Sequence, residues 1–248
     1  GIRDIGVTGV QTCALPISLL EAMRLADVKK FVFSSTTATY GEPDQVPISE
    51  DTPQRPINPY GFTKLVIEQA LADYAEAYGM GYAALRYFNA AGAHPDGTIG
   101  EDHEPETHLI PIVLQVALGQ RDSITIFGND YQTSDGTCVR DYVHVNDLAD
   151  AHLKALDKIR PSTGICLNLG TGRGTSVREI IDACREVTGH AIPEQVGQRR
   201  EGDPSELVAD ASRAQDQLGW MPQYVDVRSI VETAWRWHQL HPNGYGSK

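Results

Sequence analysis

Short apolar runs alternate with segments of helical periodicity along most of the chain. Residues 30–33, 81–88 and 165–169 are apolar runs too short for helices, and they predict buried strands. Residues 123–128 alternate between apolar and polar positions, which is typical of a half-buried strand. Helical spacing covers residues 19–29, 59–78, 108–118, 147–158, 177–188 and 227–240. Strands that alternate with helices in this way predict an α/β fold.

Hydroxyl side chains gather at the end of the first predicted strand. Residues 34–39 read Ser-Ser-Thr-Thr-Ala-Thr, and they follow the apolar run directly. The carboxyl ends of strands are where open α/β sheets bind ligands. The helix at 59–78 opens with Pro59, a residue suited to the first helical turn. Tyr60 and Lys64 lie four residues apart and therefore share one face of that helix.

This combination of side chains can move a proton. A free tyrosine has a pKa of about 10 and is a poor base at neutral pH, but a nearby ammonium group stabilises the phenolate. Lys64 could lower the pKa of Tyr60 in this way, while the hydroxyl of Thr36 holds a substrate oxygen. The spacing alone also fits a chance helical pair. The hydroxyl cluster favours the catalytic interpretation.

Composition and charge narrow the class of protein. The chain has 248 residues, of which 41% are hydrophobic and 22% charged, as expected of a globular protein of one or two domains. The formal net charge of −12 argues against nucleic-acid or anionic-membrane binding, although local arginines can still hold a phosphate. No run of about 18 apolar residues is present, so the sequence predicts no transmembrane helix.

The cysteines are scattered and form no Cys-x-x-Cys pair. They stand at positions 13, 138, 166 and 184. This pattern predicts free thiols in a reducing, cytoplasmic compartment.

The hydroxyl cluster and the tyrosine motif together resemble a known family. Residues 34–43 (SSTTATYGEP) and 59–64 (PYGFTK) are similar to the extended short-chain dehydrogenase/reductases, and within them to the UDP-glucose 4-epimerases. The resemblance implies a Rossmann-type NAD-binding fold with a smaller substrate domain. It implies Thr36 at the catalytic Ser/Thr position, Tyr60 as the catalytic base, and Lys64 tuning Tyr60 and holding the nicotinamide ribose. Thr36, Tyr60, Lys64 and Phe88 would contact NAD.

Later motifs extend the resemblance to about residue 245. Residues 86–92 (RYFNAAG) and 135–145 (DGTCVRDYVHV) match the family in order, and residues 199–203 (RREGD) follow. The resemblance implies that Asn89, Arg140 and Arg200 bind the UDP phosphates, and arginine suits this role because its planar fork can make two parallel bonds. The implied substrate-binding set is Asn89, His108, Leu109, Thr125, Phe127, Arg140, Arg200, Asp203 and Leu207.

The members of this set have different implied roles. Thr125 and Phe127 would pack against the uracil, and Asp203 would lie near the ribose. Leu207 would stand near the sugar, where residue size influences whether N-acetylated sugars fit. His108 departs from the asparagine found at its position in the family, which leaves its role open.

Three other features have plainer interpretations. Residues 93–106 carry His94, His103 and several acidic residues, but no spacing typical of a metal site, so we expect a solvated loop and no metal. The glycine-rich turn at 170–176 lacks a P-loop Gly-Lys-Ser/Thr, and Ser176 with Glu179 predicts a capping box instead. His144 is expected to be a packed structural residue.

The beginning of the chain does not continue the pattern. Residues 7–9 (Val-Thr-Gly) are like the start of a dinucleotide fingerprint, but Thr12 stands where a glycine would continue it. Pro16 is expected to break any helix that follows.

A different interpretation fits this segment. Residues 7–17 resemble the translation of a short-read sequencing adapter, with residues 1–4 as the flanking primer and 5–6 as its index. Such segments are excluded from fold reasoning. The expected organisation is then an artefactual segment at 1–17, the rear part of an NAD-binding domain at 18–92, and a mainly substrate-binding domain at 93–248. Segments at about 124–170 would return to the NAD-binding domain.

The resemblance implies one activity. A UDP-glucose 4-epimerase would interconvert UDP-glucose and UDP-galactose by transient oxidation at C4 with bound NAD, and would act as a homodimer. Thr37 and Ala38 stand where 4,6-dehydratases need an acid and a base, which disfavours that reaction. Epimerases of UDP-N-acetylglucosamine or UDP-glucuronate, and a non-catalytic nucleotide-binding protein, stay open. Because the glycine-rich first turn of the family is absent, we expect the isolated chain to bind NAD poorly and to be inactive.

Overall fold

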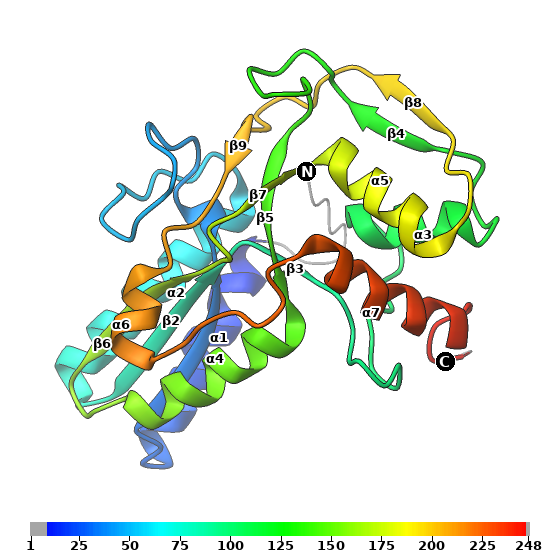
Figure 1. Ribbon diagram of the computed structural model, residues 1–248. Helices are drawn as coiled ribbons and strands as arrows, with labels where there is room; N and C mark the ends of the chain where they lie inside the picture. Colours follow the sequence, from blue (N-terminus) through cyan, green and yellow to red (C-terminus); the bar gives the residue numbers. More distant parts are fainter. Residues whose placement is uncertain (1–8, 247–248) are drawn as a thin grey trace. The chain divides into compact units, whose positions relative to one another are not determined.

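The computed structural model describes residues 9–246, with side chains described from Leu15 onward (Figure 1). The chain forms two compact units, each assembled from separate stretches of sequence. Of the described residues, unit 1 contains 9–88, Ala149–Leu169 and Ala209–Met221. Unit 2 contains Asn89–Leu148, Gly170–Val208 and residues 222–246.

Unit 1 is built on a parallel sheet. Its strands are β1 (Lys30–Thr36), β2 (Gly81–Tyr87) and β6 (Gly164–Leu169), in the order β1-β2-β6. All three strands were predicted from the apolar runs. Strand β1 continues three residues beyond the prediction, because its pairing with β2 extends to Thr36 opposite Tyr87. The hydroxyl cluster therefore begins inside the strand and not after it.

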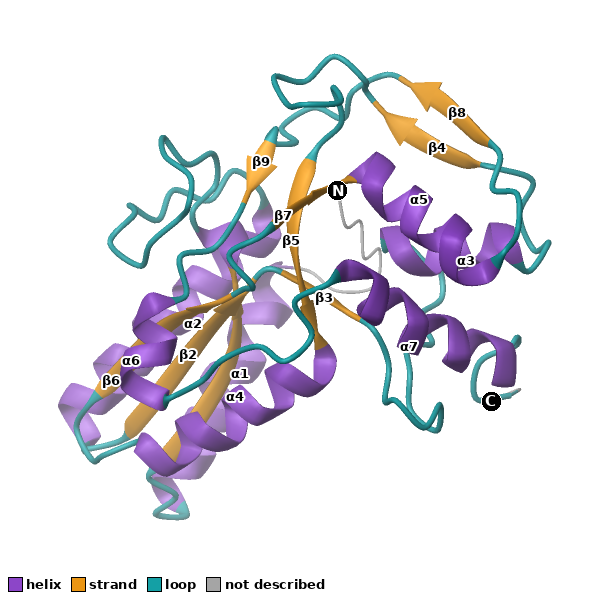
Figure 2. Cartoon of the chain, viewed as in Figure 1, coloured by secondary structure: helices purple, strands orange, loops and turns teal. Residues whose placement is uncertain are grey.

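Helices cover both faces of this sheet (Figure 2). Helices α1 (Gly9–Leu25) and α2 (Pro59–Tyr78) lie on one face, and α6 (Ser212–Leu218) and the later part of α4 (Val145–Lys158) on the other (Figure 1). The alternation of side chains along the strands sends one set of apolar residues toward α1 and α2. The buried core on that side consists of Leu20, Met23, Phe33, Ile67, Leu71, Ala75, Met80, Tyr82 and Ala84.

Helix α1 differs from the sequence prediction. It runs through Pro16, where a break was expected. A proline inside a helix costs a hydrogen bond and crowds the preceding turn, but packing elsewhere can outweigh that cost. Here Leu20 and Met23, in the following turns, are buried in the core. Residues 1–8, which include the start of the adapter-like segment, lie outside the described residues.

One buried carboxylate ties α2 to the sheet. Glu68 accepts hydrogen bonds from Ser35 on β1, from Gln54 and from the Arg86 guanidinium on β2. Both members of the Glu68–Arg86 ion pair are only 6% exposed. Burial alone would lower the pKa of Arg86, but the bonds and charge of Glu68 outweigh it and raise that pKa. Arg86 also donates to the hydroxyl of Tyr40 at 2.9 Å.

Within its described residues, unit 2 contains two small sheets and three complete helices. Strand β5 (Val139–His144) pairs with β3 (Asn89–Ala91) and β9 (Glu206–Leu207) in parallel and with β7 (Gly174–Ser176) antiparallel. Strands β4 (Ile124–Phe127) and β8 (Glu194–Gly197) form a separate parallel pair. Helices α3 (Leu109–Ala117), α5 (Val177–Thr188) and α7 (Val227–Leu240) enclose an apolar core that includes Val113, Leu114, Ile180, Ile181, Ile230 and Val231.

The local predictions for unit 2 are confirmed at several points. Ser176 caps α5 by accepting the amide of Glu179, and the Ser176 amide donates in return to the Glu179 carboxylate, which completes the capping box. His144 is fully buried and stacks on Tyr224 with ring centroids 3.7 Å apart. Burial lowers the pKa of His144 to about 4. Its Nδ1 accepts the amide of Asn146, so His144 closes the start of α4.

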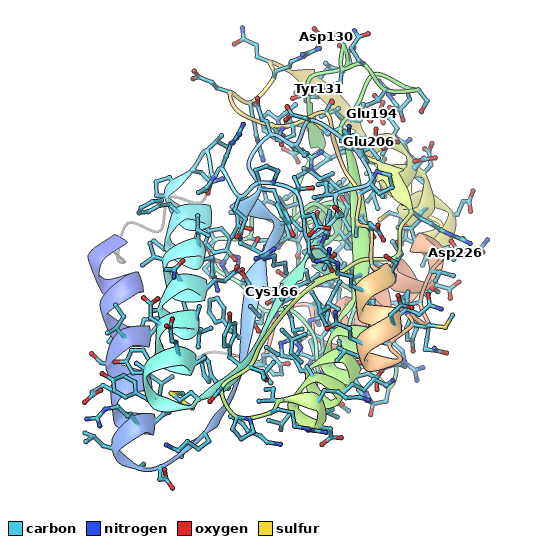
Figure 3. All side chains as sticks on the ribbon, turned by 90° about the vertical axis from the view of Figure 1, so that its left-hand side faces the viewer. Asp130, Tyr131, Cys166, Glu194, Glu206 and Asp226 are labelled. Carbon is cyan, nitrogen blue, oxygen red and sulfur yellow. The ribbon has the colours of Figure 1, made fainter. Side chains whose placement is uncertain are left out.

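Two further findings concern the chain as a whole. Of the described residues, no helix is long and apolar enough to cross a membrane. Cys138, Cys166 and Cys184 are free thiols, as predicted, and Figure 3 labels Cys166 on β6. The side chain of Cys13 lies outside the described residues.

The buried Glu68–Arg86 pair generates a stability prediction. Replacing Glu68 with Gln leaves a buried guanidinium charge without its counter-charge, and we expect a loss of about 3–5 kcal/mol in the free energy of unfolding. The exposed Asp150–Lys154 pair on α4 is the matched control, and D150N should cost no more than about 0.5 kcal/mol. Urea unfolding of both variants measures the difference. Equal losses in the two variants would contradict the central role of Glu68.

Candidate functional site

The carboxyl end of β1 turns sharply into a single 3-10 turn. Thr36 ends the strand, and its Oγ1 accepts the amide of Ala38 at 3.2 Å to cap the turn Thr37–Thr39. Thr39 Oγ1 donates back to the Thr36 carbonyl at 3.0 Å. These two bonds fix the backbone around Thr36. The side chain of Thr36 is thereby held at the edge of the sheet where α/β proteins bind ligands.

Helix α2 begins against this turn. Asn58 caps the helix by accepting the amide of Gly61 at 2.8 Å, and Pro59 occupies the first turn, as predicted. A side chain at Gly61 would place its Cβ 2.3 Å from the Ala38 carbonyl oxygen. Only glycine permits this close approach. The glycine therefore brings the first turn of α2, with Tyr60, beside Thr36.

Tyr60 and Thr36 meet, as the motif predicts. A hydrogen bond with Thr36 stabilises the phenolate of Tyr60 and acts to lower its pKa. Desolvation and the nearby Tyr87 act in the opposite direction and prevail, so the pKa of Tyr60 is raised above its usual value. The sequence had predicted a lowered pKa.

The position of Lys64 explains why the pKa of Tyr60 is raised and not lowered. Its ammonium nitrogen donates to the Ser34 carbonyl at 2.9 Å. It stands 4.9 Å from the ring centre of Phe33 and 5.6 Å from that of Tyr60. The charge thus faces the ring of Tyr60 and a strand carbonyl, and makes no hydrogen bond with the phenol oxygen. Partial burial lowers the pKa of Lys64.

The remaining predicted cofactor residue follows β2. The amide of Phe88 donates to the Leu169 carbonyl at 3.3 Å, and the side chain is 7% exposed. Phe88 therefore continues the sheet pairing between β2 and β6. Its packing is that of a core residue at the carboxyl end of the sheet.

Unit 2 contains a cavity of about 300 Å³. All but one of the predicted substrate residues line it, although they come from separate strands, helices and loops. They are Asn89, His108, Leu109, Thr125, Phe127, Arg140, Arg200 and Asp203. Leu207 is not among the lining residues; it lies on β9, paired with Arg140.

The arginines of the cavity have different partners. Arg140 forms an ion pair with Asp203 and is largely buried. Arg200 lies over the ring of Phe127, with its guanidinium carbon 3.9 Å from the ring centre. A guanidinium that stacks on an aromatic ring keeps its N–H groups available for hydrogen bonds at the ring edge. Arg200 is thus the cavity arginine for which the structure gives no carboxylate partner.

Its neighbour Arg199 is not among the lining residues. Arg199 pairs with Asp130 at 2.6 Å and stacks on Tyr131 at 4.1 Å, two adjacent residues labelled in Figure 3. The two consecutive arginines therefore have separate environments. Of these two consecutive arginines, only Arg200 lines the cavity.

Sequence reasoning missed several lining residues. Trp237 and His238 on α7 and Cys138 before β5 also face the cavity. The helical periodicity of residues 227–240 gave no sign of a role beyond packing. In the folded chain His238 is only 9% exposed, and desolvation lowers its pKa. Neither property can be read from the sequence.

His108 does not stand alone in the cavity wall. Its Nδ1 lies 2.5 Å from Glu101 Oε1 and 3.2 Å from Glu106 Oε1. The bonds to Glu101 and then to Glu106 raise the pKa of His108 to about 10. The solvated loop that the sequence predicted at 93–106 is therefore ordered at this end around a charged cluster.

Comparison with known proteins identifies the class. A family model described as the NAD dependent epimerase/dehydratase family matches residues 3–170. The chain belongs to this family. The match includes residues 3–17, so the adapter-like interpretation of that segment stays a prediction.

Individual relatives are more specific. UDP-glucose 4-epimerase of Halalkalibacterium halodurans is 57% identical over 232 residues, which are 93% of this chain and 70% of that protein. UDP-glucose 4-epimerase of Lacticaseibacillus casei is 56% identical over 233 residues, which are 94% of this chain and 70% of that protein.

Two solved structures have the same fold. UDP-glucose 4-epimerase from Brucella ovis in complex with NAD has a TM-score of 0.89 and 47% identity, covering 94% of this chain and 72% of that one. The enzyme from Bifidobacterium longum in complex with NAD⁺ and UDP has a TM-score of 0.90 and 40% identity, covering 96% and 71%. The α/β Rossmann-type fold predicted from the sequence is confirmed.

Proposed function

We propose that this chain is a UDP-glucose 4-epimerase, which interconverts UDP-glucose and UDP-galactose with bound NAD. The observation that carries the proposal is the contact between Thr36 and Tyr60, with Lys64 one turn further along α2. Relatives that are more than half identical over most of the chain carry the same enzyme name. We assign NAD and the reacting C4 group of the sugar to unit 1, and the UDP part of the substrate to unit 2.

The residues of unit 1 fit NAD. Thr36, Tyr60 and Lys64 lie at the carboxyl end of parallel strands, the edge where dinucleotides bind. Lys64 uses one of its three N–H donors on the Ser34 carbonyl, which leaves donors for ribose hydroxyls. When bound, NAD supplies the hydride acceptor and donor for the C4 position. This hydride transfer needs a rigid site from which water is excluded. The buried carboxyl ends of β1 and β2 provide such a site at the edge of the sheet.

Proton transfer belongs to the side chains. Thr36 holds the O4 oxygen of the sugar through its hydroxyl, and Tyr60 takes the O4 proton as the C4 hydrogen leaves. The same phenol returns the proton when the other epimer forms. Because burial raises the pKa of Tyr60, its phenolate must be favoured by the Thr36 bond and by positive charge in the assembled site. Lys64 is the cationic side chain next to that ring.

The cavity of unit 2 suits a nucleoside diphosphate. Arg140 and Arg200 bring positive charge to a chain of net charge −12, and arginine forks match phosphate oxygens. Thr125 and Phe127 on β4 supply a wall for the uracil. Asp203 and Asn89 supply hydrogen-bonding groups, as expected for ribose and phosphate contacts. Leu207, which does not line the cavity, is proposed only as a neighbour of the sugar.

Other reactions on this scaffold are disfavoured by the residues after Thr36. A 4,6-dehydratase needs an acid and a base there. Thr37 is buried, and Ala38 has no titratable group. The site therefore supports oxidation and return of hydride at C4 without elimination.

Four finer interpretations remain proposals. We infer that residues 1–17 are not part of the enzyme, on the strength of their resemblance to a translated adapter. We infer a homodimer from the family resemblance. A cytoplasmic location is supported by the free thiols of Cys138, Cys166 and Cys184, and the acidic charge supports partners other than nucleic acid or membranes.

Tyr60 provides the direct test of the proposed chemistry. In the chain supplied with NAD, Y60F should lower the conversion of UDP-galactose by about 10²- to 10⁴-fold, the usual contribution of a general base. Y74F on the same helix is the matched control and should change the rate by no more than about twofold. A coupled assay for UDP-glucose measures both. Y60F activity close to that of the control would refute the assignment of Tyr60 as the base.

The consecutive arginines test the assignment of the cavity. R200Q should weaken UDP binding by about 10- to 100-fold, because a hydrogen bond to a charged phosphate is lost. R199Q removes the same charge next to it, but outside the cavity, and should weaken binding by no more than about twofold. Isothermal titration with UDP compares the two variants without requiring turnover. Equal weakening would show that net charge, and not the position of Arg200, determines affinity.

A further inference from the structure

Four potential metal ligands meet at the start of helix α3. Glu101, His103, Glu106 and His108 each offer one ligand atom, and these atoms all lie within 4.8 Å of one another. We propose that this His–Glu cluster, defined by these four residues, binds one divalent zinc ion. The sequence predicted no metal here, because the spacing of the residues does not match a known zinc motif.

The donor set suits zinc. Zn²⁺ binds imidazole nitrogens at about 2.0–2.1 Å and carboxylate oxygens at about 2.0–2.2 Å in tetrahedral sites, which separates neighbouring ligand atoms by about 3.4 Å. In the cluster, His108 Nδ1 is 3.2 Å and His103 Nδ1 is 3.7 Å from Glu106 Oε1. The shortest contact, 2.5 Å from His108 Nδ1 to Glu101, must open to admit the ion. Glu101 and His108 are partly exposed, so their side chains have room for that movement.

Glu106 is held in place from outside the cluster. Its side chain is 4% exposed, and Oε1 accepts the amides of Thr107 and His108 at 2.7 Å each. The carbonyl of Glu101 accepts the indole N–H of Trp237 at 3.0 Å, which anchors the other end of the loop to α7. Bonds of this kind orient metal ligands and are part of a working site.

The charge of the His–Glu cluster and the cavity beside it also suit a cation. The two carboxylates balance the charge of a divalent ion when both imidazoles are neutral. Glu101, His103 and Glu106 also line a second cavity of about 350 Å³ in unit 2. That cavity has further acidic groups, Asp102 and Glu104, in its wall. It gives a cation an entry route with a favourable field.

Zinc in the cluster would also affect the neighbouring cavity. The ion would fix the loop to the first turn of α3, where His108 and Leu109 form part of the cavity wall.

The test measures zinc binding to the whole chain after chelator treatment. Isothermal titration should give about one Zn²⁺ per chain. H103A removes an exposed ligand outside the proposed substrate set and should weaken binding at least about tenfold. H94A is the matched control, because His94 forms a similar pair with Asp96 in the same loop, and it should bind as the unaltered chain does.

Cobalt substitution separates this cluster from the free thiols. Co²⁺ held by imidazole and carboxylate gives weak visible bands, whereas a cysteine ligand adds an intense thiolate charge-transfer band. We expect the weak bands alone, and we expect H103A to abolish them. Thiolate charge transfer, or equal zinc affinity in H103A and H94A, would overturn the proposal.

Discussion

A single buried carboxylate, that of Glu68, sets the geometry on which the proposed chemistry depends. It binds Ser35 on β1 and Arg86 on β2 from the middle of α2. Tyr60, Lys64 and Glu68 follow one another at four-residue intervals, so they lie along one face of the helix. Glu68 fixes that face against the sheet, and the close approach at Gly61 fixes its first turn against the end of β1. The position of Tyr60 beside Thr36 follows from these two constraints.

Unit 2 follows a different principle. Its cavity is not built on one helix but gathers side chains from β3, β4, β5, α3 and the segment before β9. Packing of α3, α5 and α7 around one apolar core holds these elements together. Charged groups of the cavity pair with one another, as Arg140 does with Asp203. A charged ligand such as a diphosphate can replace such partners, because it offers the same fork-shaped acceptor to a guanidinium.

The sequence predicted local structure well where capping groups mark it. Helices α2, α5 and α7 have the predicted bounds because Asn58, Ser176 and Asp226 close their first turns. Strands β3, β7 and β9 were not predicted, since two or three residues give no periodic signal and only pairing with β5 defines them. The residues that the family resemblance implied for substrate binding line one cavity, except Leu207. The His–Glu cluster was missed because its four residues are brought together by the fold of a loop and not by helical spacing. The raised pKa of Tyr60 was missed because it depends on desolvation in the folded chain, which no sequence motif reveals.

Transfer of the C4 hydrogen to NAD and back is the central claim. It is tested by incubating the chain and NAD in ordinary water with UDP-galactose that carries deuterium at C4. The account predicts UDP-glucose with the deuterium retained at C4, because the hydride returns from the same cofactor without meeting solvent. Product that carries ordinary hydrogen at C4 would contradict it.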